Sequence, residues 1–266
     1  GARVGPIGPD FGEAPGKWVS CTPARKGSKY YCVPYDWSRV LETDPTTKQV
    51  REMGDVIETG GAKYTAAIAC QNFHGHLFAA PCRADKVLVI DPVQGTASEV
   101  GPELGSREKA KWWAIGLSPT NGRLYAVPYD ARKVLEIDPN KGGEAKLVGP
   151  DLGKGKGKYA SIALAPNGNL YAAPLNASKV LEISGQGEVK LVGPDFGLLP
   201  RKYACIVRAP NKLLYAPPLY ADRVLEINCA KGNTRQIGGV LGTGEAKYAC
   251  AAAAANGKVY AAPLEA

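Results

Sequence analysis

The 266 residues include 33 Lys and Arg against 25 Asp and Glu, which gives a net charge of +8, and 45% of them are hydrophobic. These values are ordinary for a globular protein, and no stretch approaches the eighteen or so apolar residues of a membrane-spanning helix. The positive charge suits an acidic partner. The lysines are spread along the chain without a basic block, so nucleic acid is not the expected ligand.

A lysine followed by an aromatic residue recurs six times, at steps of 46, 48, 47, 44 and 45 residues. The six pairs are Lys17-Trp18, Lys63-Tyr64, Lys111-Trp112, Lys158-Tyr159, Lys202-Tyr203 and Lys247-Tyr248. A fixed period in this range is typical of propellers and solenoids, in which each repeat is one structural unit. The repeat leaves no linker, so we expect residues 1–266 to form one domain.

Each repeat begins with two predicted strands joined by a tight turn. The first strand is short and apolar, as in Ala114–Leu117 and Ser161–Ala165, and an Asn-Gly hairpin signal follows at residues 121, 167 and 256. The second strand is an aromatic residue, then small residues and a proline, which cannot donate to a ladder and so marks the strand end. The second strands are Tyr31–Pro34, Phe78–Pro81, Tyr125–Pro128, Tyr171–Pro174, Tyr215–Pro218 and Tyr260–Pro263.

Two more strands follow in each of the first five repeats. The third strands read Val-Leu-Glu-Ile or similar and are Val40–Asp44, Val87–Asp91, Val134–Asp138, Val180–Ser184 and Val224–Asn228. The fourth strands end at Met53, Val100, Val148, Val192 and Ile237, each followed by glycine. Four antiparallel strands in about 45 residues are the blade of a β-propeller. The predicted fold is therefore all-β, a six-bladed β-propeller whose blades start near residues 17, 63, 111, 158, 202 and 247.

The last blade has no third strand in this sequence, since only Leu264–Ala266 follow its second strand. Arg3–Pro6 match the end of a fourth strand, as in Leu147–Pro150, so we expect residues 1–16 to close the last blade as its outer strand. The missing third strand belongs either to a longer chain from which the sequence is taken or to a partner that adds it by β-augmentation.

One segment has a helix propensity that conflicts with its place in the repeat. Ala251–Ala255 taken alone favours a helix. It occupies the place of a first strand in its repeat, and Asn256-Gly257 follows it. Strands nearest a propeller axis are crowded by neighbouring blades, which suits small residues, so we expect a strand here.

The seven cysteines are an odd number, so at least one is unpaired or pairs with another chain. They are Cys21, Cys32, Cys70, Cys82, Cys205, Cys229 and Cys250. Their spacing fits no zinc motif. Cys205 and Cys250 occupy one repeat position where other repeats have Ser or Ala, which favours small-residue filling. We therefore expect buried free thiols rather than disulfides.

The blade pattern, read at Gly122–Pro139 and Ala165–Ile183, resembles NHL-type repeats and gluconolactonase-like (SMP-30) propellers. The likeness covers nearly the whole chain and implies the fold more than an activity. The aspartate that closes the second strand in those families is replaced by proline in all six repeats here. Gluconolactonase-like enzymes hold a divalent metal with Glu, Asn and Asp, and no such cluster can be placed in this sequence. No metal ligand, cofactor or catalytic residue is therefore predicted.

The candidate ligand site is the set of six Lys–aromatic pairs. The resemblance places these pairs at the mouth of the propeller channel, where Lys17, Lys63, Lys111, Lys158, Lys202 and Lys247 would form a ring beside Trp18, Tyr64, Trp112, Tyr159, Tyr203 and Tyr248. A basic, aromatic rim suits anions, sugars or an acidic peptide. The alternative is structural, because Asp10, Glu103, Asp151 and Asp195 lie in the same predicted loops and could pair with the lysines.

Other residues are weaker candidates. His74 and His76 are the only histidines, and a hairpin turn is their expected place. A second basic position lies just before the third strand, and we expect it to be a solvent-exposed strand end. Its residues are Arg39, Lys86, Lys133, Lys179 and Arg223. Residues that break the repeat are the better site pointers, and they are Trp37, Arg83, Trp113, Arg208 and Tyr220.

The sequence favours a non-catalytic binding or scaffold propeller that contacts a protein partner within a larger assembly, and the net charge suits an acidic partner. A metal-dependent hydrolase of the gluconolactonase type and a lectin-like carbohydrate binder are the alternatives. The residues do not indicate a compartment.

Overall fold

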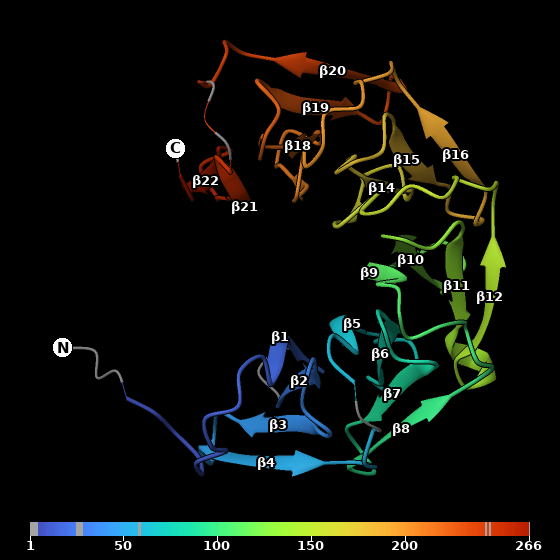
Figure 1. Ribbon diagram of the computed structural model, residues 1–266, viewed down its shortest axis with the longest axis vertical. Coiled ribbons are helices and arrows are strands. Elements are labelled where there is room, and N and C mark those ends of the chain that lie inside the picture. Colours follow the sequence, from blue (N-terminus) through green and yellow to red (C-terminus); the bar gives the residue numbers. More distant parts are fainter. Residues whose placement is uncertain (1–4, 25–28, 58–59, 243, 245, 266) are drawn as a thin grey trace. The chain divides into compact units, whose positions relative to one another are not determined.

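The computed structural model describes residues 5–24, 29–57, 60–242, 244 and 246–265, and their regular secondary structure is β-strand apart from one short 3-10 turn. The strands form five four-stranded antiparallel sheets and one two-stranded sheet (Figure 1). Each sheet corresponds to one predicted blade. No helix among the described residues is long and apolar enough to cross a membrane.

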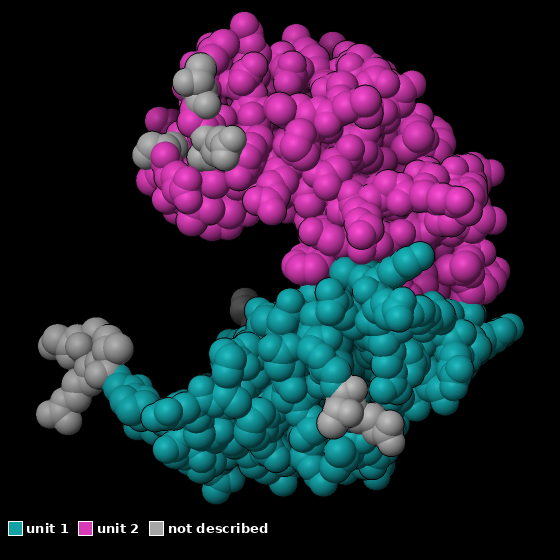
Figure 2. Space-filling model, viewed as in Figure 1, with its two compact units in different colours: residues 1–110, 138–145 teal, residues 111–137, 146–266 magenta. Residues whose placement is uncertain are grey.

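The chain divides into two compact units, residues 1–110 with 138–145 and residues 111–137 with 146–266 (Figure 2). The single-domain prediction stays a prediction. The strands of the first two sheets are β1 (Trp18–Pro23), β2 (Tyr30–Pro34), β3 (Val40–Asp44), β4 (Gln49–Met53), β5 (Tyr64–Ala69), β6 (Leu77–Pro81), β7 (Val87–Asp91) and β8 (Thr96–Val100).

The third sheet contains β9 (Trp112–Leu117), β10 (Leu124–Pro128), β11 (Val134–Asp138) and β12 (Glu144–Val148), with a 3-10 turn, η1 (Pro139–Lys141), before its last strand. The remaining strands are β13 (Ala163–Leu164), β14 (Leu170–Ala172), β15 (Val180–Ile183), β16 (Val189–Val192), β17 (Val207–Arg208), β18 (Leu214–Ala216), β19 (Val224–Asn228), β20 (Asn233–Ile237), β21 (Tyr248–Ala253) and β22 (Val259–Pro263). In the first five sheets the strands are hydrogen-bonded in sequence order, so each sheet is a meander.

The predicted second, third and fourth strands are confirmed to within two residues at either end. The first strand of the fourth blade is shorter than predicted and covers only Ala163–Leu164. The alanine-rich segment is a strand, as expected, but Ala254 and Ala255 belong to the following turn. Cross-strand pairing with β22 therefore outweighs the helix propensity of alanine.

The N-terminal closure stays a prediction. Residues 1–4 lie outside the described residues, and residues 5–17 form no strand. Among the described residues the last sheet consists of β21 and β22 only.

The asparagine of the hairpin turn holds both the turn and the strand that follows. Asn121 Oδ1 accepts the N–H of Arg123 at 3.0 Å, and its Nδ2 donates to the Tyr125 hydroxyl at 2.8 Å. Gly122 takes a φ of +70°, which other residues adopt only at a cost. The same donation from asparagine to tyrosine recurs in the last three blades, at Asn167, Asn211 and Asn256.

A buried glutamate on the third strand ties the middle of a blade together. The Tyr31, Tyr125 and Tyr215 hydroxyls donate to Glu42, Glu136 and Glu226 at 3.1–3.2 Å. These glutamates, with Glu182, are at most 8% exposed, and each pairs with one or two cations. A carboxylate can stay charged at such burial because it is paired and hydrogen-bonded.

The second blade replaces this network with apolar residues. Phe78 stands where other blades have tyrosine, and Val89 stands opposite it, where they have glutamate. Both partners change together, so neither a hydroxyl nor a carboxylate is left unpaired in the core.

Facing sheets within each unit pack in one recurring way. Tyr171, Ala173 and Val180 on one sheet contact Leu214, Leu225 and Ile227 on the next. The corresponding residues meet between the first two sheets, with Tyr31, Val33 and Val40 against Leu77, Leu88 and Ile90. The third strand thus contributes two apolar side chains, at alternate positions, to each interface.

The expectation of buried thiols is only partly right. The seven cysteines are free, and Cys70 and Cys82 are buried, but Cys21 and Cys250 are exposed. The exposed pair lies on β1 and β21, which are edge strands of their sheets.

The coordinated change in the second blade leads to a prediction for the third. Replacing Tyr125 by Phe or Glu136 by Val should each destabilise the protein, because the partner is left buried without its hydrogen bond. The double variant should be more stable than the sum of the single effects by about 1 kcal/mol. Urea unfolding of the four proteins measures this coupling, and additive effects would contradict the proposed pairing.

A second prediction concerns acid. Burial alone raises the pKa of Glu42, but hydrogen bonds from Arg51 and Lys29 outweigh it and hold that pKa below its ordinary value of 4.5. The ionised carboxylate therefore stabilises the fold above about pH 4.5, and this contribution is lost as the pH falls through the folded-state pKa. Glu42→Gln should lower the free energy of unfolding near pH 6 and have a smaller effect near pH 3. The exposed Glu13→Gln is the control; an equal Glu42→Gln effect at both pH values would refute the assignment.

Candidate functional site

The lysines of the predicted ring are mostly buried. Lys63, Lys111, Lys158, Lys202 and Lys247 are at most 5% exposed, and Lys17 is half-buried. In five of the six pairs the lysine Nζ donates to the carbonyl oxygen three residues earlier, with acceptors Ala14, Gly60, Gly155, Leu199 and Gly244. Burial lowers the pKa of Lys63, Lys158 and Lys202. Each of these five amines therefore forms a hydrogen bond within its own loop.

The backbone of the same lysines joins successive blades within each unit. The Lys158 N–H donates to the Tyr129 carbonyl at 2.8 Å, and its own carbonyl accepts from Leu175 at 2.9 Å. Tyr129 and Leu175 each follow the proline that ends a second strand. Lys63, Lys202 and Lys247 donate in the same way to Tyr35, Leu175 and Leu219.

Four of the six aromatic partners are buried. Tyr64, Trp112, Tyr159 and Tyr203 are at most 2% exposed, whereas Trp18 and Tyr248 are half-buried. Five of the six donate through the side-chain tip to the carbonyl before the third strand, at Arg39, Lys86, Lys133, Lys179 and Arg223. These five residues are the second basic position of the repeat. Their backbone carbonyls therefore accept hydrogen bonds that hold the blade together.

Three of the four acids of these loops make contacts other than a lysine salt bridge. Asp151 pairs with Arg132, and Asp10 and Asp195 accept backbone N–H groups two residues later, at 2.7 Å. The lysines prefer carbonyls because their loops turn the backbone toward Nζ. Ligand binding by the twelve residues stays a prediction, and the buried amines give it no support.

The repeat-breaking residues make different local contacts within each unit. In the first unit, Trp37 lies 5.6 Å from Trp18, between ring centroids, and Arg83 lines a small polar cavity with Arg107. In the second unit, Trp113 stacks on Tyr129 at 4.7 Å, Arg201 lies over Tyr220 at 5.8 Å, and Arg208 is an exposed residue of β17. No three His, Cys, Asp or Glu residues gather to hold a metal in the described part of the chain.

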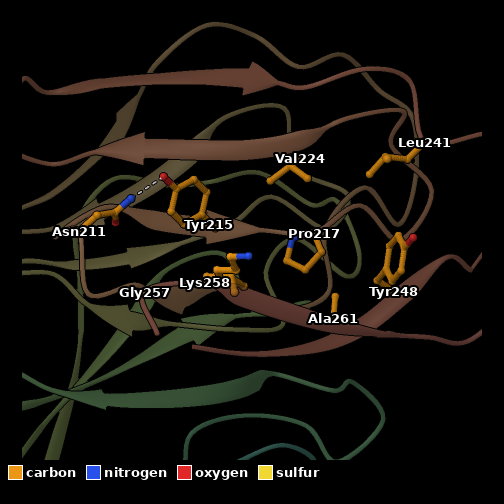
Figure 3. A pocket seen from close by; sticks show the side chains of 10 residues that line it. Asn211, Tyr215, Pro217, Val224, Leu241, Tyr248, Gly257, Lys258 and Ala261 are labelled. Atoms are coloured by element: carbon orange, nitrogen blue, oxygen red, sulfur yellow. Dashed lines mark hydrogen bonds between the residues drawn. The ribbon is translucent and has the colours of Figure 1, made fainter. Parts of the chain in front are cut away.

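A cavity of about 540 Å³ lies in the second unit, between the fifth sheet and the two-stranded last sheet (Figure 3). Tyr215, Pro217 and Val224 line it from the fifth sheet, and Val259 and Ala261 line it from β22. The pocket runs beside the edge of β22 that no described strand pairs with.

The residues that line the pocket can be compared with those of the preceding interface between two sheets. Tyr215, Pro217 and Val224 correspond to Tyr171, Ala173 and Val180 in the preceding, filled interface. Val259 and Ala261 correspond to Leu214 and Ala216. Leu225 and Ile227, which complete the filled interface from a third strand, have no counterpart among the described residues. In the filled interface, the corresponding space holds these two apolar side chains from alternate positions of the third strand.

Two polar residues of the last hairpin occupy repeat positions that contact a carboxylate in other blades. The Tyr260 hydroxyl accepts from Asn256 at 2.8 Å, as its counterparts do, but no glutamate stands opposite it among the described residues. Lys258 lies two residues before Tyr260, where Lys29 and Arg123 pair with Glu42 and Glu136 in other blades. Lys258 lines the pocket and has no carboxylate partner in the described ranges.

The sequence pattern by itself does not indicate the pocket residues. The available signal was the repeat position two residues before the second-strand tyrosine, which is basic in three blades: Lys29, Arg123 and Lys258. Its meaning depends on the cross-strand register, which places that residue next to the glutamate of the third strand.

Comparison with known proteins identifies the fold. No family model and no curated protein sequence matches this chain. Virginiamycin B lyase from Staphylococcus aureus has a TM-score of 0.71 at 15% identity, over 94% of this chain and 85% of the lyase. A proposed 6-phosphogluconolactonase from Bacteroides uniformis has a TM-score of 0.62 at 19% identity, over 91% and 77%.

A third neighbour is the extracellular domain of a proposed hybrid two-component system from Bacteroides thetaiotaomicron, with a TM-score of 0.64 at 13% identity, over 98% of this chain and 34% of that one. Identities this low show the fold alone, and it is the β-propeller fold. The same fold serves lyases, lactonases and receptor domains, so it does not select a function.

The placement of the lysines can be tested by chemical labelling. Acetic anhydride should modify Lys63, Lys158, Lys202 and Lys247 at least about tenfold more slowly than the exposed Lys231, because a buried amine reacts only after local opening. Peptide mapping by mass spectrometry gives the rates in the folded protein. Rates equal to that of Lys231 would instead favour an accessible ring.

Proposed function

We propose that this protein is a non-catalytic β-propeller that binds an extended, acidic segment of a partner protein as an added strand along β22. The observation that carries the proposal is the pocket beside this edge, whose lining matches a filled interface except for two apolar side chains of a third strand. An unpaired edge also offers a row of backbone N–H and C=O groups to an incoming strand.

The register of the fifth sheet defines the chemistry of the partner. There, Ile227, Glu226 and Leu225 stand opposite Leu214, Tyr215 and Ala216. The same register on β22 puts leucine opposite Ala261, glutamate opposite Tyr260 and isoleucine opposite Val259. The side chains flanking the glutamate enter the pocket, because alternate residues of a strand share a face.

Charge favours the same occupant. Lys258 and the Tyr260 hydroxyl lie where other blades bind the carboxylate of their own third strand. A glutamate from the partner would receive two hydrogen bonds, one of them charge-assisted. The net charge of +8 adds long-range attraction for an acidic segment.

The histidines support a non-catalytic role. One structural neighbour is a catalytically inactive histidine-to-alanine variant of virginiamycin B lyase with quinupristin. In this chain both histidines lie in the turn between β5 and β6. His76 Nε2 is 3.0 Å from Asp91 Oδ2, and its Nδ1 is 2.9 Å from the Phe73 carbonyl oxygen. Its ring nitrogens are therefore occupied by contacts that hold the turn.

A peptide with the sequence of residues 132–139, Arg-Lys-Val-Leu-Glu-Ile-Asp-Pro, tests the proposal. It should bind saturably by isothermal titration calorimetry, and substituting lysine for its glutamate should weaken binding about tenfold or more. Exchanging the peptide's leucine and glutamate should abolish binding, because the apolar side chains then no longer match the pocket.

A charge reversal on the protein provides the matched control. Lys258→Glu should weaken binding of the glutamate peptide and restore binding of the lysine peptide. Lys231→Glu, which changes the net charge by the same amount, should do neither. Absence of binding by the original peptide, or equal binding of all three peptides, would overturn the proposal. A concentration-dependent dimer that excludes the peptide would instead make a second copy the occupant.

A further inference from the structure

Two cysteines face each other across the first hairpin. In the antiparallel pairing of β1 with β2, Cys21 stands directly opposite Cys32. The N–H of Ala24 donates to the carbonyl of Lys29, so Ala24 and Lys29 form a hydrogen-bonded pair. Hydrogen-bonded and non-hydrogen-bonded pairs alternate along antiparallel strands, which makes Cys21–Cys32 a non-hydrogen-bonded pair.

This type of pair brings the side chains close. Non-hydrogen-bonded residues have Cα atoms about 4.5 Å apart, which is within the range that a disulfide can bridge. Burial raises the pKa of the Cys32 thiol to about 12, and hydrogen bonding with Cys21 adds to this effect. The two sulfur atoms are therefore neighbours, and both cysteines are reduced in this structure.

The other hairpins do not have a reactive pair at the corresponding positions. Ala67 faces Ala79 in the second blade, Ile115 faces Ala126 in the third, and Ala251 faces Ala261 in the last. Aliphatic residues therefore satisfy the packing at this level of the blade. The change to cysteine on both strands of one hairpin breaks the repeat at two facing positions.

We propose that Cys21 and Cys32 form a redox site that closes to a cross-strand disulfide by exchange with a small disulfide such as oxidised glutathione. Cys21 is exposed and Cys32 is half-buried, so the Cys21 thiolate attacks first. It forms a mixed disulfide and releases one glutathione thiolate. The sulfur of Cys32 then attacks the Cys21 sulfur, gives up its proton and displaces the second glutathione.

In the net reaction two protein thiols are oxidised and one glutathione disulfide is reduced to two glutathione molecules. The product links β1, the edge strand of the first sheet, covalently to β2. β1 is otherwise held in its sheet by β2 alone. Oxidation should therefore stabilise this edge against local opening, whereas the pairing of the other sheets is unchanged.

Peptide mapping without reduction tests the assignment. After incubation of the folded protein with oxidised glutathione, the peptides that contain Cys21 and Cys32 should be linked, with loss of two hydrogen atoms. Hydrogen exchange of β1 should slow in the oxidised protein. Cys21→Ser and Cys32→Ser should each abolish the link, and Cys250→Ser, which removes another exposed thiol, should leave it unchanged.

A trivalent arsenical that bridges two nearby thiols gives an independent readout. Phenylarsine oxide should add once to the reduced protein at these two peptides, and it should not bridge them in either serine variant. Circular dichroism of each variant first establishes that it is folded. Cys21 left as a stable glutathione mixed disulfide, or linkage of Cys21 to another cysteine in the folded protein, would overturn the proposal.

Discussion

The packing of a blade in this protein depends on the side chains that the third strand places against the second strand. The third strand supplies two apolar side chains to the interface with the preceding blade, as Leu225 and Ile227 do, and a carboxylate between them that the second-strand tyrosine and a basic residue receive. Burial of the apolar pair favours the fold by roughly 2 kcal/mol for each side chain. The carboxylate can be buried only because its hydrogen-bond partners are already in place. The pocket beside β22 is lined by the counterparts of residues that line such an interface in the preceding blade, and the proposed partner strand would meet the same requirement.

The exceptions in the repeat show which contacts depend on one another. Phe78 and Val89 change together, because a tyrosine hydroxyl and a glutamate carboxylate each need the other in the core. Cys21 and Cys32 also change together, although their neighbours in other blades are aliphatic and packing alone does not require it. The first exchange removes a polar pair and preserves stability, whereas the second introduces chemistry that no other blade has.

The lysines show that a repeat in the sequence does not by itself predict the contacts of the repeated side chains. Six regularly spaced Lys–aromatic pairs were expected at a channel mouth, and strict repetition could equally be explained by packing. The structure places the described amines against carbonyls three residues earlier and the aromatic tips against carbonyls before the third strand. Such contacts depend on how a loop turns back on itself and on which strand lies beside it.

The sequence alone determined the number of blades and the positions of most strands. Asn-Gly turns, prolines at strand ends and alternating apolar residues act over a few residues, and six copies of the pattern reinforced one another. Ala251–Ala253 became a strand for the same reason, against its local propensity. Only the tertiary structure decided that five of the six lysines are buried, that Lys258 and Val259 line a pocket, and that two cysteines face each other. These features arise from the register between strands and the packing between sheets, which bring together side chains that are far apart in the chain.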